Sequence, residues 1–191
     1  LDDFVVAASI EFDEIKTNWK LLMENFIEPY HVQFVHKTTT SQPLADHYVV
    51  EDEHCLGSAV DLTSEQKNKG KEGTLSVSSR YLTLFPNFVL GVYYPDQLGV
   101  HLNQPISAGS THQRRVIYQL KSIDQSADEI KKIRKLWISV HKEDHVICER
   151  LQQGRHSDLS EQGGLLSPHW ESSVRKFQEL VADSIRPAFK H

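Results

Sequence analysis

The spacing of apolar residues changes along the chain, and each change indicates a different kind of structure. Residues 46–122 alternate between apolar and polar positions and are rich in Val, Leu, Tyr and Phe, which predicts strands of an antiparallel sheet. TSEQKNKGKEG has the charge and glycine of an exposed loop, and SAGST is typical of a turn. The segments expected to form strands are HYVVEDEHC, TLSVSSRYLTLF, FVLGVYY, GVHLNQPI and QRRVIYQLK.

The regions on both sides of this sheet are predicted to be helical. One helix is expected to follow the alternating start VVAASIEFDEI. In the last third, Ser126 and Glu129 form a capping-box pattern that marks the start of a helical stretch. Gly154 is expected to cap its end, and the pattern is compatible with one break between these two ends. A final helix is expected from Ser167 to Pro187. The order of helix, sheet and helices predicts an α+β domain with the helices on one face.

Composition narrows the class of protein. With 191 residues and 39% hydrophobic content, the chain is long enough for one domain with a sizeable core. The net charge is -5 and basic residues are interleaved with acidic ones, so no nucleic-acid partner is expected. The sequence lacks an apolar run of about 18 residues, so no membrane span is expected. Cys55 and Cys148 form neither a disulfide framework nor a metal knuckle, which fits a cytoplasmic location.

The segment NWKLLMENFIEPYHVQFVH combines two glutamates and two histidines with the pattern of an amphipathic helix. On a regular helix, Glu24, Glu28 and His31 share the face opposite the apolar stripe, and the simplest interpretation is a solvated surface. His36 would lie about 140° away from His31. The two imidazoles therefore converge only if the helix ends or bulges between them, and Pro29 favours such an irregularity.

A carboxylate interrupts an apolar seam in the last third of the chain. Asp144 occupies one position in a seam whose members follow alternating spacings of three and four residues. A charged carboxylate left unpaired in a core is costly, so Asp144 needs either a metal ion or a helix N-terminus to cap. In the second case the residues HKE would separate two helices. The apolar members of the seam are Ile130, Ile133, Trp137, Val140, Ile147 and Leu151.

These residues supply the ligand types of a reactive metal site. Two neutral imidazoles and one carboxylate can hold a ferrous ion on one face and leave positions open for oxygen and substrate. A structural zinc site would need four protein ligands, usually with cysteine, and neither cysteine has a suitable neighbour. The candidate ligands are His31, His36 and Asp144.

The motifs resemble the catalytic, C-terminal domain of Rieske-type non-haem iron oxygenases, the large (alpha) subunits of ring-hydroxylating dioxygenases. The first motif is Glu24-x3-Glu28-x2-His31-x4-His36, preceded by Asn-Trp-Lys. LFPN, YYPDQL, EDHVICERLQQG and LSPHWESSVRKFQ follow in the order of that family, so the resemblance covers nearly the whole chain. It implies a helix-grip fold of the START/Bet v1-like type, in which a curved antiparallel sheet packs on a long C-terminal helix.

The resemblance also implies a role for each residue of these motifs. His31, His36 and Asp144 match the three iron ligands, and Glu143 is the rival for the third. Glu28 matches the acidic residue that bridges to the Rieske cluster of a neighbouring subunit, a position at which many members have aspartate. The residues expected to support the ligands or to line a substrate pocket are Glu24, Phe85, Val89, Tyr93, His101 and Asn103.

The cluster itself is expected elsewhere. The family's two-iron cluster is bound by a Cys-x-His and a Cys-x2-His pair, which this sequence lacks. Residues 1–191 are therefore expected to form a single mononuclear-iron domain, with a Rieske [2Fe-2S] domain upstream in a longer protein. In such an enzyme, electrons pass from NAD(P)H through a reductase or ferredoxin to the cluster, and then to the iron that activates O2. The expected assembly is a homotrimer.

The expected reaction is hydroxylation or oxidative demethylation of a small organic substrate. EDHVICERLQQG and SPHWE resemble the branch of the family that acts on quaternary ammonium compounds more than the naphthalene type. Both a quaternary amine and an aromatic compound remain candidate substrates. An aromatic cage for a methylated cation would come from Tyr81, Tyr93, Tyr94 or Trp137.

Two other functions compete with the oxygenase hypothesis. A helix-grip domain can enclose an apolar cavity and bind a small hydrophobe without metal. The segment HKEDH resembles a zinc peptidase motif, with two histidines one helical turn apart. A zinc hydrolase of this kind would use His141, Asp144 and His145.

Overall fold

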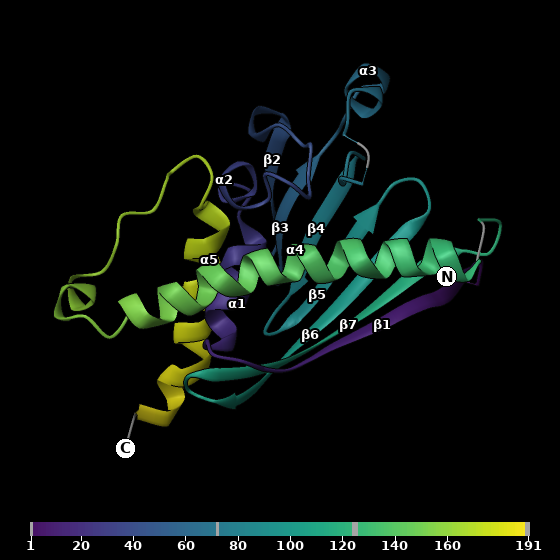
Figure 1. The fold of residues 1–191 in the computed structure, drawn as a ribbon. Coiled ribbons are helices and arrows are strands. Elements are labelled where there is room, and N and C mark those ends of the chain that lie inside the picture. The colour runs from purple at the N-terminus through teal and green to yellow at the C-terminus, as the bar shows by residue number, and fades with distance from the viewer. Residues whose placement is uncertain (1, 72, 124–125, 190–191) are drawn as a thin grey trace.

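Seven antiparallel strands form one sheet in the computed structural model, which describes residues 2–71, 73–123 and 126–189. Within the described residues, the strand order is β1-β7-β6-β5-β4-β3-β2, so the first strand pairs with the last (Figure 1). Neighbouring strands other than β1 and β7 are consecutive in sequence. The strands are β1 (Phe4–Ile15), β2 (His47–Glu51), β3 (Cys55–Val60), β4 (Ser79–Leu84), β5 (Phe88–Tyr93), β6 (Gln97–Ser107) and β7 (Ser110–Leu120).

The antiparallel sheet confirms the α+β class, but one region of it differs from the prediction. HYVVEDEHC is not one strand, because β2 ends at Glu51 and β3 begins at Cys55. The sequence of β3, CLGSAV, is almost continuously buried and built partly of small residues, so it lacks the alternation that identifies a half-exposed strand. The expected loop TSEQKNKGKEG contains a short helix, α3 (Ser64–Asn68), which starts with a capping box between Thr63 and Gln66.

The long helix α4 (Ala127–Gly154) is continuous over 28 residues. Ser126 caps it as predicted, since its side chain accepts a hydrogen bond from the backbone N of Glu129. The interruption that the sequence left open is absent, so Asp144 lies in mid-helix and the N-cap alternative for it is wrong. Gly154 is the last helical residue and Arg155 is the C-cap, because the chain leaves the helix without a left-handed residue.

The final helix starts later than expected. Helix α5 (Ser172–Ile185) begins after a turn in which the Glu171 carboxylate accepts a hydrogen bond from the backbone N of Ser167. The short 3-10 segments are η1 (Leu44–Asp46), η2 (Asp158–Gln162) and η3 (Arg186–Phe189). No helix of the described residues is long and apolar enough to cross a membrane.

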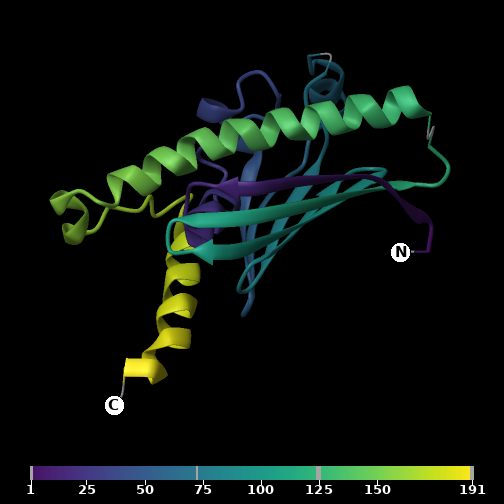
Figure 2. The same ribbon diagram turned by 60° about the horizontal axis from the view of Figure 1, so that its bottom comes forward.

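Two groups of helices cover the same face of the sheet. Val89 and Tyr93 on β5 are four residues apart, so both side chains point to this face. Val89 packs against α1 (Trp19–Ile27) and α5, whereas Tyr93 packs against Trp137 of α4. Figure 2 shows α4 lying across the sheet and α5 crossing near one end. The space between α1, α4 and the sheet is where the candidate site lies.

The covered face of the sheet is polar over much of its area. Inward-facing positions on β6 and β7 carry buried polar residues, although a sheet covered by helices normally presents apolar side chains there. Such a reversal is informative, because buried polar groups are costly unless they have partners or a ligand to bind. The residues concerned are His101, Asn103, Gln113, Arg115 and Gln119.

Candidate functional site

Helix α1 ends just where the sequence pattern required an irregularity. The Asn18 side chain caps its start by accepting a hydrogen bond from Lys20 N, and its last residue is Ile27. Glu28 is extended, Pro29 follows, and the short helix α2 (Val32–Val35) then begins in a new direction. This break brings the rings of His31 and His36 to a centroid separation of 5.2 Å, which confirms the predicted interruption.

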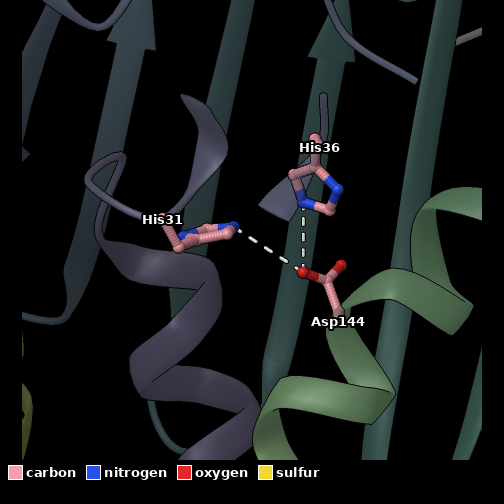
Figure 3. Close-up of side chains that lie close together, drawn as sticks. All are labelled: His31, His36 and Asp144. Atoms are coloured by element: carbon pink, nitrogen blue, oxygen red, sulfur yellow. Dashed lines mark ion pairs between the residues drawn. The ribbon is translucent and has the colours of Figure 1, made fainter. Parts of the chain in front are cut away.

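The two imidazoles converge on Asp144 of α4 (Figure 3). Asp144 Oδ1 lies 3.1 Å from His36 Nε2 and 3.6 Å from His31 Nε2. One ligand atom from each of the three residues lies within 4.8 Å of the other two. Among the described residues, this is the group of His, Cys, Asp or Glu side chains whose geometry would accommodate a metal ion.

Carboxylates outside this triad hold both histidine rings. Glu28 Oε1 lies 2.7 Å from His31 Nδ1, and its Oε2 accepts a hydrogen bond from His31 N. Glu143 Oε2 lies 2.8 Å from His36 Nδ1. An ionised carboxylate can only accept, so Nδ1 of each ring carries the proton and a neutral ring has its lone pair on Nε2. Glu28 and Glu143 thus aim both Nε2 atoms at Asp144.

The charges in the triad are strongly coupled. Burial disfavours the charged form of His36, but the Asp144 and Glu143 carboxylates outweigh it and raise the pKa of His36 to about 9. Burial also opposes ionisation of Asp144, yet His36 and His31 bring the pKa of this carboxyl below its usual range. The chain therefore holds the Asp144 anion beside the His36 imidazole, whose charged form is favoured, and a metal cation would replace that proton.

A cavity lies beside the triad, and four of the six predicted supporting residues line it. These are Val89, Tyr93, His101 and Asn103. The structure places Phe85 elsewhere, because its ring packs on Phe177 of α5 at a centroid distance of 6.0 Å. Glu24 also faces away from the cavity and accepts a hydrogen bond from Gln178 Nε2 at 3.1 Å.

Sequence reasoning missed Gln113 and Arg115, which also line the cavity. Both share the inward face of β7 with the buried Ile117, because Gln113 lies four and Arg115 two residues before it. A strand that places Gln and Arg in register with its buried residue carries a signal for a polar pocket. That signal is visible in QRRVIYQLK once the inward face is known.

The histidines of HKEDH are engaged separately and do not converge with Asp144. His141 Nε2 lies 3.1 Å from Arg115 Nη1, and His145 Nε2 lies 3.3 Å from Gln113 Oε1. Asp144 points instead to His31 and His36. The zinc hydrolase hypothesis therefore has no geometric support.

Three of the four residues expected for an aromatic cage line the cavity, namely Tyr81, Tyr93 and Trp137, and Tyr94 does not. Tyr94 is 44% exposed and stacks against Arg80, with 5.5 Å between the guanidinium carbon and the ring centroid. The face of Trp137 is already covered by Arg115, whose guanidinium carbon lies 3.6 Å from the ring centroid. The protein's own cation therefore occupies the Trp137 ring, one of the surfaces on which a methylated cation was expected.

Comparison with known families agrees with this geometry. Residues 1–186 match the family model of the ring hydroxylating alpha subunit (catalytic domain). The chain belongs to this family. The match covers the triad, the cavity and the whole sheet.

Curated relatives are chloroplastic choline monooxygenases. That of Atriplex hortensis is 27% identical over 158 residues, which cover 81% of this chain and 34% of the relative. That of Spinacia oleracea is 24% identical over 157 residues, which cover 81% of this chain and 35% of the relative. The chain thus spans about a third of the length of these relatives.

Solved structures share the fold. A quaternary ammonium Rieske monooxygenase, described with carnitine oxidation and inter-subunit electron transfer, superposes with a TM-score of 0.78. It is 20% identical, and the match covers 95% of this chain and 51% of the other. Dicamba monooxygenase bound to dicamba superposes with a TM-score of 0.70 at 18% identity, covering 94% of this chain and 59% of the other.

The two neighbouring carboxylates on α4 can be separated by experiment. We expect Asp144→Asn to lower the affinity for Fe(II) by more than about 100-fold, since it would remove the anionic member of the triad. Glu143→Gln should cost only about 10-fold, because its amide oxygen can still accept a hydrogen bond from His36 Nδ1. Anaerobic Fe(II) titration against a competing chelator measures both. A larger loss in Glu143→Gln than in Asp144→Asn would make Glu143 the ligand.

Proposed function

We propose that this chain is the mononuclear-iron domain of a Rieske-type oxygenase, in which His31, His36 and Asp144 hold one ferrous ion. The observation that supports this most directly is the approach of the three ligand atoms to within 4.8 Å of one another. Two imidazoles and one carboxylate fit ferrous iron, because this set leaves open positions for reactants. Bound there, the iron would supply the site of dioxygen activation. The helix-grip description of the fold belongs to the same proposal.

The chain's own residues would prepare this site in three ways. Glu28 and Glu143 fix the tautomer and direction of the imidazoles through Nδ1. Asp144 sits inside a continuous helix, so its carboxylate is held by a rigid element. The cavity beside the triad lies between α1, α4 and the sheet, and it would position a small substrate next to the metal.

Electron supply is proposed to come from outside the chain. The family match supports a Rieske [2Fe-2S] cluster in another part of the full-length protein, fed by NAD(P)H through a reductase or ferredoxin. We infer that Glu28 links the iron site to the cluster of a neighbouring subunit in a homotrimer. The cytoplasmic location stays a prediction, since the choline monooxygenases are chloroplastic.

The iron proposal is tested by the metal content of the full-length protein. Anaerobically purified wild type should carry about one mononuclear iron per chain in addition to the cluster, and show O2-dependent product formation with its reductase. His31→Ala should lose the mononuclear iron and the product. His145→Ala is the matched control, because it removes a cavity histidine outside the triad and should keep the iron.

Two results would contradict this proposal. Stoichiometric zinc that disappears on His141→Ala would favour the hydrolase alternative. Tight binding of a small hydrophobe by a wild type that takes up no metal would favour the metal-free binding module.

The role of Glu28 needs a separate experiment, because both of its oxygens contact His31. In the full-length protein, Glu28→Gln should keep iron and cluster while NADH-driven turnover falls by orders of magnitude. Hydrogen peroxide, which supplies oxygen and electrons together, should still give one product-forming turnover. Loss of iron in Glu28→Gln would instead mean that Glu28 acts by holding His31. Unimpaired NADH turnover would remove Glu28 from the electron route.

A further inference from the structure

A guanidinium group is buried in the wall of the cavity. Arg115 on β7 is 1% exposed, and its hydrogen-bond partners are neutral, while the Asp144 carboxylate lines the same cavity. Its Nη1 donates hydrogen bonds to Nε2 of His101 and of His141, and its Nη2 lies 3.4 Å from the Tyr93 hydroxyl. Burial and the nearby Arg115 charge hold the pKa of both histidines well below the usual range, so both rings accept as neutral imidazoles.

Two glycines make room for this arrangement. Gly91 on β5 and Gly99 on β6 are directly paired across the strands. A Cβ at Gly99 would lie 2.5 Å from Arg115 Nη2, and a Cβ at Gly91 would lie 2.2 Å from the Tyr93 hydroxyl. Glycine weakens a strand, so a glycine pair in the middle of the sheet indicates that close approach of these side chains is required.

The hydrogen bonds of Arg115 are incomplete. A guanidinium has five N–H donors, and Arg115 uses three of them within the described part of the chain. Nε is buried without a hydrogen-bond partner. Arg115 also forms no ion pair with any Asp or Glu of the described residues. Nε–H and one N–H of Nη2 form the fork that matches the two oxygens of a carboxylate.

We propose that Arg115 binds a carboxylate group of the substrate, so that the substrate is an organic acid or a betaine and not a simple cation. The statement that the bound acid is the substrate rests on the proposed function. A bound carboxylate would satisfy Nε and balance the buried charge. A purely cationic substrate such as choline, the substrate in the names of the curated relatives, would meet a like charge at this wall.

The position of Arg115 suits a substrate that spans the cavity. Its partner His141 precedes Asp144 by three residues on α4, which is about one helical turn, or roughly 5 Å along the axis. An acid bound at Arg115 would therefore place its remaining atoms near the triad. Trp137, stacked on the guanidinium, would keep the Arg115 side chain in place.

The test compares acids with amides that carry a neutral carboxamide in place of the carboxylate. Isothermal titration under argon on the iron-loaded full-length protein would measure benzoate against benzamide, and γ-butyrobetaine against its amide. We expect at least one acid to bind the wild type about 10-fold or more tightly than its amide. Arg115→Gln should weaken binding of that acid by about 10- to 100-fold. It should leave the neutral benzamide within roughly twofold, and it should not weaken the cationic amide of γ-butyrobetaine.

Matched variants separate a binding role from a packing role. Arg114→Gln is the control, because the neighbouring Arg114 side chain is 57% exposed and pairs with Glu11 on the opposite face. It should leave both affinities unchanged. Arg115→Lys keeps the charge without the fork and should retain part of the preference. Gly99→Ala keeps the arginine but must displace its Nη2, so it should weaken the acid and spare the amide.

Three results would overturn the inference. The first is that the wild type binds neither acid more tightly than its amide. The second is that Arg115→Gln still binds the acid more tightly than the amide. The third is that Arg115→Gln loses affinity for acid and amide equally. The failure of the proposed function looks different. An Arg115-dependent acid that gives no O2-dependent product would leave the binding site standing and refute the oxygenase, whereas turnover of choline with no acid preference would do the reverse.

Discussion

The carboxylate of Asp144 is the constraint around which this domain is organised. It lies within a 28-residue helix and points toward His31 and His36 beside the cavity, where an unpaired charge is costly. His31 and His36 approach it only because α1 stops before Pro29 and the chain changes direction. One break in a helix near the N-terminus and one charge in a helix near the C-terminus thus depend on each other. A metal ion would join the two segments permanently.

The polar residues on the inner face of the sheet are explained in the same way, as groups that would bind the substrate. Packing alone would favour apolar residues at these positions, yet β6 and β7 present His101, Asn103, Gln113 and Arg115. The paired glycines of β5 and β6 remove side chains so that Arg115 and Tyr93 can lie close to the sheet. Stability is lost at these positions, which is typical of a site that is shaped for a ligand. We infer that the triad and Arg115 divide the cavity between a reacting end and a recognition end.

Much of the fold could be predicted, because it follows from local patterns. The alternating segments, the Ser126 cap and the irregularity at Pro29 each depend on nearby residues, and the structure confirms them. The strand β3 was missed because its buried small residues do not alternate. The proposed break in α4 was wrong because Asp144 is compensated by distant histidines, so the helix has no need to end there.

The candidate site could be predicted only as far as its residues fall in sequence motifs. His31, His36 and Asp144 stand out by residue type and spacing, and the structure brings them together. The prediction for Phe85 was wrong because its ring packs against α5. The sequence of one strand does not show where a distant helix packs. Arg115 was missed for a related reason. Its importance depends on which face of β7 is covered and on glycines of two other strands.

Anomalous X-ray diffraction would test the central claim most directly. Crystals equilibrated with Fe(II) in the absence of oxygen would be measured on both sides of the iron absorption edge. The account predicts one iron peak in contact with His31 Nε2, His36 Nε2 and the Asp144 carboxylate. An iron peak at His141 and His145 would contradict it. The absence of any iron peak, with His31, His36 and Asp144 still in direct contact with one another, would also contradict it.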